Sequence, residues 1–347
     1  MKATATRYDL QFKRPSGTSR GVLTEKETWF LTLEHQDKKG IGECGLLRTL
    51  SIDDRPDYAE KLQWVCEHIH WGEAALLEQL EAFPSIQFGV ETAFHSLASE
   101  HPFILFPSAF TKGEAQQSIN GLVWMGDADF MREQIQEKFA QGFKCIKLKI
   151  GALDFDTELA LLHEIRKKFD EKTIEIRVDA NGAFDPSDAL YKLNHLAGFK
   201  LHSIEQPIAV KQYDKMAELC EITPIHIALD EELIGVFGSE KKWELLKRIR
   251  PQYIILKPSL VGGCGGSTQW IEIAKSLNIG WWVTSALESN IGLNAIAQWT
   301  FMQRNPLPQG LGTGGLYTNN ISSPLVIKEG YLSYDVGLGW DTGDVGF

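Results

Sequence analysis

The stretch KCIKLKIG, residues 144–151, alternates between apolar and polar side chains in the way a β-strand does. One face holds three branched aliphatic residues, and the other carries Lys147 and Lys149. On an edge strand the two ammonium groups could point to water. Inside a barrel they would be buried, and burying charge is costly unless the charge is paired. The rest of the chain decides between these two interpretations.

Short apolar segments alternate with helical segments from about residue 117 onward. The strand candidates are SINGLVW, KCIKLKI, IEIRVDA, KLHSIEQ, IHIALDE, YIILKPS, GWWVTSA and, as the weakest, PQGLGTG. The helix candidates between them are 128–141, 155–169, 187–197, 211–221, 239–249, 266–277 and 289–303. Repeated βα units predict a parallel sheet, and about eight strands in about 200 residues predict a closed βα barrel. We therefore expect an α/β protein whose barrel has seven βα units plus a final strand, over residues 115–319.

The first part of the chain has a different order. Its strand candidates, 3–13, 22–35 and the segment IGECGLL, precede its helix candidates, 55–70, 72–82 and 86–99. Strands followed by helices are typical of an α+β unit. We expect residues 1–114 to form a capping domain. The strand-like tail, residues 320–347, is expected to return to it.

Composition narrows the classes of function. The 347 residues carry a formal net charge of −11 without a dense basic run, which argues against a nucleic-acid partner. The five cysteines are widely spread and form no CxxC pair, which favours a reducing compartment over a disulfide framework or a zinc site. We see no signal-peptide core and no apolar run of about 18 residues, so we expect a cytoplasmic protein without a membrane partner. The sequence does not specify an oligomeric state.

Charged residues stand at the ends of five successive strand candidates. In chain order they are Lys147 with Lys149, Asp179, Glu205, Asp230 with Glu231, and Lys257. Asp179 and Lys149 alternate with apolar neighbours, so the apolar faces are expected to meet the helices and the charged faces the barrel axis. Active sites of βα barrels lie at this carboxyl-terminal mouth.

Three carboxylates on three successive strands would repel one another. A hard divalent cation with oxygen ligands relieves that repulsion, and Mg²⁺, with Mn²⁺ as a substitute, suits the set Asp179, Glu205 and Asp230. A lysine near other cations and away from water has a lowered pKa and can act as a base. A lone strand-end Asp is more often a helix cap, and a lone inward Lys can be a structural ion pair. Neither explanation accounts for the whole ordered set.

Eight segments carry a resemblance to a known family. They are KLKIG, RVDANGAF, IEQP, ALDEEL, LKPSLVGG, SALESNIGL, GIGECGLL and FGVETAFHSL. Together they cover nearly the whole chain, which is similar to the muconate-lactonizing subgroup of the enolase superfamily. Within that subgroup the chain most resembles the o-succinylbenzoate synthases of menaquinone biosynthesis.

The resemblance implies a reaction and a role for each charged residue. The reaction is a Mg²⁺-dependent syn β-elimination of water from 2-succinyl-6-hydroxy-2,4-cyclohexadiene-1-carboxylate, through an enediolate. The resemblance implies that Lys149 is the base and that Lys147 modulates it. It implies that Lys257 stabilises the enediolate. The implied Mg²⁺ ligands are Asp179, Glu205 and Asp230, with Asn181 and Glu231 supporting the site from behind. The implied partner is therefore a small-molecule carboxylate.

Individual positions of the sequence help to distinguish other reactions of the same superfamily. An N-succinylamino acid racemase would use the same two lysines, and this alternative stays open. Enzymes similar to mandelate racemase use a histidine where this chain has Lys257. Dipeptide epimerases carry an Asp-x-Asp motif where this chain has GLGTGGLYTNN. A Schiff-base aldolase would not need three carboxylates, and a non-catalytic protein would be expected to have lost part of the set.

Glycine-rich segments offer weaker indications of substrate contact. The segments 262–267 and 310–315 lack the spacing of a dinucleotide-binding loop, so we interpret them as tight turns at the barrel mouth. Ser285 and Gly312 are the candidates for contact with substrate oxygens. Cap loops 14–21 and 45–54 are expected to close the mouth and set substrate choice. Arg20 and Arg48 could meet a substrate carboxylate there, although a solvated surface role is the more ordinary one.

Overall fold

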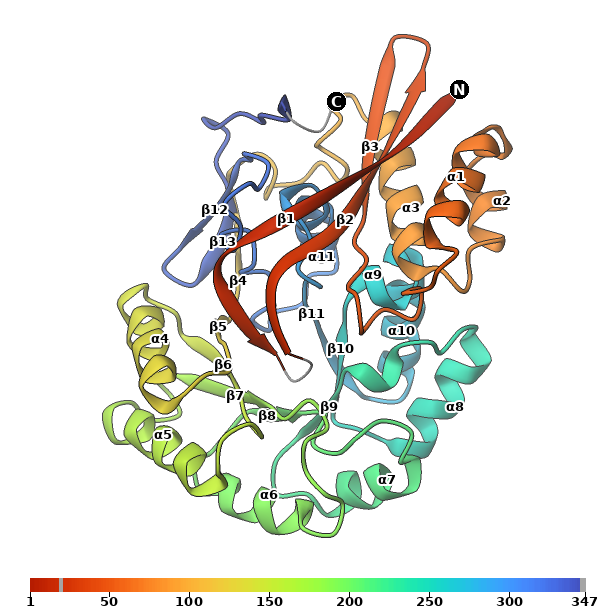
Figure 1. Ribbon diagram of the computed structural model, residues 1–347. Helices are drawn as coiled ribbons and strands as arrows, with labels where there is room; N and C mark the ends of the chain where they lie inside the picture. Colours follow the sequence, from red (N-terminus) through yellow and green to blue (C-terminus); the bar gives the residue numbers. More distant parts are fainter. Residues whose placement is uncertain (19–20, 344–347) are drawn as a thin grey trace.

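The computed structural model of the chain describes residues 1–18 and 21–343 (Figure 1). Its largest sheet has the strand order β11-β10-β9-β8-β7-β6-β5, and every neighbouring pair in it is parallel. The strands are β5 Gly121–Val123, β6 Cys145–Lys149, β7 Glu175–Asp179, β8 Ser203–Glu205, β9 Ile227–Leu229, β10 Tyr253–Leu256 and β11 Gly280–Val283.

Helices follow these strands and lie on the outside of the curled sheet in Figure 1. They are α4 Ala128–Ala140, α5 Phe155–Lys168, α6 Ala189–Ala197, α7 Tyr213–Ile222, α8 Ser239–Ile249, α10 Gly263–Ser276 and α11 Asn290–Met302. A short extra helix, α9 Pro258–Val261, follows β10 and was not expected from the sequence. The alternation of strand and helix that the sequence predicts is thus confirmed.

The final strand position is filled without a regular strand. Residues Gln309 and Gly310 form isolated parallel bridges to Ile119 and Thr284, at the two ends of the curled sheet. The amide of Gln309 donates to the carbonyl of Ser118 at 2.9 Å, and the amide of Gly310 donates to the carbonyl of Val283 at 2.8 Å. The segment expected as the last strand therefore links the two ends of the barrel. Proline and glycine in PQGLGTG shorten it, because proline donates no backbone hydrogen bond.

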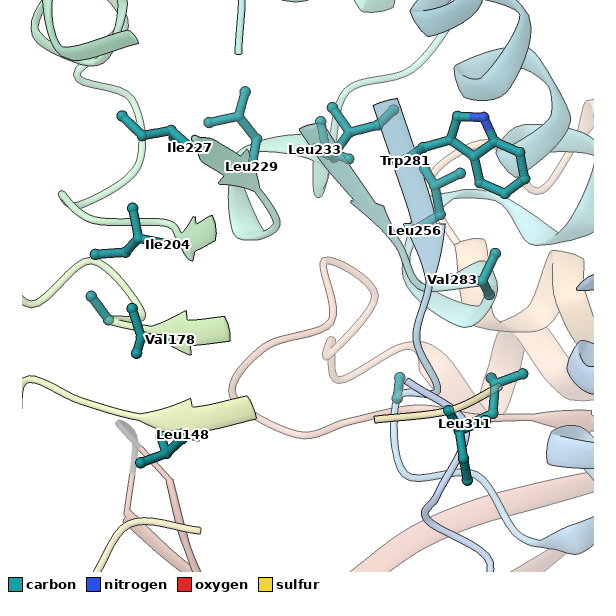
Figure 2. Packing of buried hydrophobic residues seen from close by; sticks show 14 of the residues in the cluster. Leu148, Val178, Ile204, Ile227, Leu229, Leu233, Leu256, Trp281, Val283 and Leu311 are labelled. Atoms are coloured by element: carbon teal, nitrogen blue, oxygen red, sulfur yellow. The ribbon is translucent and has the colours of Figure 1, made fainter. Parts of the chain in front are cut away.

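The two faces of the barrel strands are separated as the alternation predicts. Leu148, Val178 and Ile204, on three neighbouring strands, belong to the main core cluster (Figure 2). The same cluster also includes apolar residues of the surrounding helices. The opposite face points to the barrel axis. Below the charged mouth this axis is filled by a small separate cluster that includes Ile255 and Trp282. The strand within KCIKLKIG is therefore an interior strand, and Lys147 and Lys149 face the axis.

The N-terminal strands form an antiparallel sheet, in the order β1-β2-β3, with helices packed against it. The elements are β1 Lys2–Thr18, β2 Gly21–His35, β3 Lys38–Cys44, α1 Tyr58–Glu67, α2 Glu73–Glu78 and α3 Pro84–Ala98. The long β1–β2 hairpin extends over the barrel (Figure 1), where Gly17 bridges to Met125 and Phe12 bridges to Tyr317. Its pairing shifts between Gln11 and Ser16, around the single proline of the strand.

The tail contacts both parts of the molecule. Strands β12 Leu325–Lys328 and β13 Tyr331–Tyr334 form a sheet with β4 Gln116–Ser118, at the start of the barrel region. Trp340 stacks on Phe103 with ring centroids 4.1 Å apart. Both belong to a cluster that also holds residues of β2 and β3. The domain limits 1–114 and 115–319 remain a prediction.

The contact between β3 and α3 generates a first testable prediction. A Cβ at Gly42 would overlap the carbonyl oxygen of Gly89 and lie 2.7 Å from the amide nitrogen of Ala93. We expect Gly42→Ala to lower the free energy of unfolding by about 2 kcal/mol, because the strand cannot approach the helix backbone. The control is Gly339→Ala, since a Cβ there meets nothing within 4 Å. Urea denaturation followed by circular dichroism measures both, and equal stability of the two variants would contradict the packing argument.

Candidate active site

A cavity of about 150 Å³ lies at the carboxyl ends of the barrel strands and is lined from both parts of the chain. Eight of the predicted site residues line it: Lys147, Lys149, Asp179, Asn181, Glu231, Lys257, Ser285 and Gly312. Residues Thr18, Leu23 and 47–50 of the N-terminal region line it from the other side. Glu205 and Asp230 are buried just behind, each paired with a lysine of the cavity wall.

Lys147 is paired with two carboxylates. Its Nζ atom lies 2.5 Å from Oε2 of Glu205 and 2.9 Å from Oδ2 of Asp179. Burial by itself lowers the pKa of Lys147, but the charges of Asp179, Glu205 and Asp230 outweigh burial and raise that pKa above its usual value. Lys147 is therefore held in its charged form.

Lys149 lies one pleat nearer the mouth and is more accessible. Its Nζ atom is 3.0 Å from Oδ2 of Asp179 and donates to Oδ1 of Asn181 at 2.7 Å. Asn181 has a φ of 45°, a conformation that asparagine tolerates better than most residues. Its side-chain amide donates to Oε1 of Glu231 at 2.9 Å. Asn181 and Glu231 thus hold the amide oxygen that accepts from Lys149.

Lys257 directly follows β10 and forms an ion pair with Asp230. Burial by itself lowers the pKa of Lys257. The charges of Asp230, Glu205 and Glu231 outweigh burial, so the pKa lies above its usual value. In the sheet, β10 is separated from β6 by β9, β8 and β7. Lys149 and Lys257 therefore reach the cavity from strands on opposite parts of the ring.

The three predicted metal ligands have the right chemistry for a hard cation. Asp179, Glu205 and Asp230 are at most 2% exposed. Oε1 of Glu205 is buried and accepts no hydrogen bond from the described residues. Burial, with the nearby charges of Asp179 and Asp230, raises the pKa of Glu205 well above its usual value. A divalent cation would satisfy that oxygen and relieve the repulsion.

The carboxylates are not arranged in advance around a cation position. Across residues 1–18 and 21–343, no group of three or more His, Cys, Asp or Glu side chains is placed to hold a metal ion. The reason is visible in the ion pairs, because Lys147 and Lys257 occupy carboxylate oxygens that a cation would need. The chemistry of the donor set fits a divalent cation, and those ion pairs would have to loosen for a cation to bind.

The part of the cavity wall that follows β11 and the final strand segment combines predicted and unexpected residues. Oγ of Ser285 is 2.6 Å from Oγ1 of Thr313, and both residues line the cavity. Leu287 also lines it and has a φ of 64°. The hydroxyl of Tyr317 donates to the carbonyl of Leu287 at 2.7 Å. The sequence analysis missed Thr313, Leu287 and Tyr317. The small residues of GLGTGGLY, beside the final strand, were an indication that this segment lies close to the cavity.

The two arginines of the cap loops have different outcomes. Arg48 lines the cavity, but its guanidinium is paired with Glu27 at 2.7 Å and with Asp54 at 2.6 Å. It is therefore engaged within the cap itself. Arg20 lies outside the described residues.

Comparison with known proteins gives the same family on three grounds. The family model described as enolase C-terminal domain-like matches residues 130–342. An o-succinylbenzoate synthase of Desulfotalea psychrophila is 47% identical, over 96% of this chain and 98% of that protein. An N-succinylamino acid racemase of Thermus thermophilus is 27% identical, over 95% of this chain and 91% of that protein.

The solved structures agree. MenC of Desulfotalea psychrophila has a TM-score of 0.86 at 45% identity, covering 96% of this chain and 99% of its own. A muconate lactonizing enzyme of Pseudomonas fluorescens has a TM-score of 0.81 at 22% identity, covering 98% and 96%, and this likeness concerns the fold. On these grounds the chain belongs to the enolase C-terminal domain-like family, in the muconate-lactonizing branch of the enolase superfamily.

Proposed function

We propose that this chain is an o-succinylbenzoate synthase of menaquinone biosynthesis. It dehydrates 2-succinyl-6-hydroxy-2,4-cyclohexadiene-1-carboxylate to o-succinylbenzoate. The observation that carries the proposal is the 47% identity, over nearly the full length of both chains, to a relative that bears this name. The charged cavity supports it, because Lys149 and Lys257 line a space that Asp179 also lines, with Glu205 and Asp230 buried just behind.

Members of this family use a divalent metal ion, and we propose Mg²⁺, with Mn²⁺ as a substitute. Asp179, Glu205 and Asp230 would hold it. When bound, the ion supplies positive charge beside the substrate carboxylate, where negative charge develops as the proton leaves. Asn181 and Glu231 would keep Lys149 oriented, as their hydrogen bonds suggest.

Lys149 is the proposed general base and general acid. The C–H bond next to the substrate carboxylate breaks, its proton goes to Nζ of Lys149, and the electron pair forms the enediolate. The C–O bond to the ring hydroxyl then breaks on the same face, the proton returns from Lys149 to that oxygen, and water leaves the now aromatic ring. Lys147 keeps its charge between Asp179 and Glu205 and adds positive potential close to this face.

Lys257 is proposed to stabilise the enediolate from the other side of the cavity. Both Lys149 and Lys257 line the cavity. This placement of two lysines also favours a second reaction, racemisation. A base on each side of a carbon is what racemisation requires, so N-succinylamino acid racemase is the alternative. The wall formed by Gly310, Gly312, Thr313 and Leu316 has no acidic side chain. This argues against a substrate with a free amino group.

We also propose the division into a capping domain, 1–114 with the tail from 320, and a barrel, 115–319. A cytoplasmic location and the absence of a nucleic-acid partner are proposed on the five free cysteines and the acidic net charge. Within residues 1–18 and 21–343, no helix has the length and apolarity needed to cross a bilayer.

The first functional prediction separates the two reactions. Purified protein with Mg²⁺ is given the cyclohexadiene substrate and, in parallel, N-succinyl amino acids of one hand. We expect dehydration, followed by the absorbance of the aromatic product, with the larger kcat/KM. Racemisation, followed by circular dichroism, without appreciable dehydration would refute the synthase assignment and leave the racemase alternative.

The second prediction concerns the base. Lys149→Ala should lower kcat by more than about 1,000-fold, because no other group takes the proton on that face, while metal binding persists. The matched control is Lys144→Ala, since Lys144 is exposed just before the same strand. We expect the control to retain parent activity. A Lys149→Ala variant within about tenfold of the parent would mean that another residue is the base.

The third prediction concerns the metal ligands. At about 100 times its dissociation constant, a bound ion stabilises the fold by about 2.7 kcal/mol, so Mg²⁺ should raise the melting temperature of the parent protein. Glu205→Gln should remove this increase, because it takes away one buried anionic ligand. Glu91→Gln, which alters a buried carboxylate outside the cavity lining, should keep it. An unchanged Mg²⁺ effect in Glu205→Gln would exclude Glu205 as a ligand.

A further inference from the structure

A buried carboxylate of the cap reaches the start of a barrel helix. Glu43, in β3, is 0% exposed and accepts a hydrogen bond from the hydroxyl of Thr28 at 2.7 Å. It also accepts from the amide of Ser289 at 2.9 Å, the hydroxyl of Ser289 at 2.5 Å and the amide of Gly292 at 2.8 Å. The first amides of a helix have no partner within it, so Glu43 caps α11 from a position 246 residues away in the chain.

The turn just before α11 forms part of the cavity wall. Leu287 lines the cavity with a positive φ, which is a strained conformation for a bulky side chain. Its amide donates to Oγ of Ser285 at 3.3 Å, and its carbonyl accepts from the hydroxyl of Tyr317 at 2.7 Å. A strained backbone persists only where its surroundings fix it from several sides. On the helix side of this turn, Glu43 provides that support.

A second buried carboxylate joins the same turn to Lys257. Glu288 is 0% exposed and accepts from the amide of Ala286 at 2.7 Å and from the hydroxyl of Ser259 at 2.6 Å. Ser259 lies two residues after Lys257. Cap residue Gly45 packs on this pair, since a Cβ there would lie 2.8 Å from Oγ of Ser259 and 3.0 Å from Cγ of Glu288. The cap therefore contacts the turns that follow both β10 and β11.

The cation of this cluster is Lys26, which the proposed mechanism does not use. It is 3% exposed, and its Nζ atom lies 3.9 Å from Oε1 of Glu43. It donates no hydrogen bond to any described residue. Burial lowers the pKa of Lys26, whereas the charges of Glu43 and Glu288 raise it, and the net direction is downward. Lys26 is therefore the basic side chain beside Glu43 in this cluster.

We propose that Glu43 is a positioning residue for the substrate cavity: by capping α11 it fixes the turn that presents Leu287 to the substrate. The role deepens, and so rests on, the proposed dehydration. Glu43 lines no part of the cavity, so it acts through Ser289 and Leu287. Its loss should loosen the wall that receives the substrate and leave the proton-transfer groups in place.

The chain contains a matched control for this role. Glu91, in α3 of the cap, is also buried and accepts from the amides of Cys264 at 2.6 Å and Gly265 at 3.1 Å, at the start of α10. The chemistry is the same as at Glu43: a cap carboxylate on the first amides of a barrel helix. The difference is that neither Cys264 nor Gly265 lines the cavity.

The experiment compares Glu43→Gln with Glu91→Gln. Steady-state kinetics give KM and kcat for the cyclohexadiene substrate, and hydrogen exchange reports the backbone amides of residues 286–292. For Glu43→Gln we expect KM to rise by about tenfold, kcat to stay within about threefold, and exchange over 286–292 to accelerate by about tenfold. For Glu91→Gln we expect KM within about twofold of the parent and unchanged exchange over 286–292.

Equal changes of KM in the two variants, or an unchanged KM and exchange in Glu43→Gln, would overturn the proposal. If Glu43→Gln does not fold, Thr28→Val replaces it, because it removes a hydroxyl that donates to Glu43 and keeps the Ser289 hydroxyl, which itself accepts from the amide of Ile291 at 3.1 Å. A higher KM with faster exchange over 286–292 then supports the role, and parent-like values refute it. If the parent protein does not dehydrate the substrate, the proposed function fails separately. The exchange comparison then decides alone, and equal exchange in the two variants refutes the positioning role.

Discussion

Burial of charge at the barrel mouth is the constraint that governs the rest of the structure. Several kcal/mol are lost for each ion taken from water unless it is paired, so Lys147 must lie between Asp179 and Glu205. The strand register provides this, because Lys149 is the register partner of Asp179, and Asp179 is the register partner of Glu205. A slip of one residue would turn these charges toward the helices and the apolar residues toward the axis.

The same pairing explains how a charged cavity can accept a charged substrate. Lysines and carboxylates offset one another's charge at the mouth, where Lys147 and Lys257 each pair with a carboxylate. The proposed substrate carries two carboxylates, one on the ring and one on the succinyl chain, and the proposed ion carries two positive charges. Binding both leaves the balance unchanged, so ion pairs are exchanged and no charge is left without a partner. An exchange of ion pairs agrees with the structure, in which the proposed metal ligands Glu205 and Asp230 are paired with Lys147 and Lys257.

Local patterns in the sequence predicted the barrel strands, their two faces and the five strand-end charges, because alternation is a property of neighbouring residues. They did not predict that the last strand would be reduced to the bridges at Gln309 and Gly310. They also missed Thr313 and Leu287 in the cavity wall, the hydrogen bond of Tyr317 to Leu287, and the contact of Glu43 with Ser289. Such contacts join residues that are distant in the chain, and a period of two or 3.6 residues carries no information about them.

Contacts between residues distant in the chain also bear on how the protein distinguishes substrates. Dehydration and racemisation both begin by removing a proton next to a carboxylate, so a shared pair of lysines cannot select between them. Selection has to come from the shape of the uncharged wall, where Leu287 and Gly312 face the cavity, and from the cap loops opposite. That wall is held by buried hydrogen bonds outside the cavity, such as those of Glu43. Substrate preference can therefore change through residues that never touch the substrate, while the charged set keeps the chemistry constant.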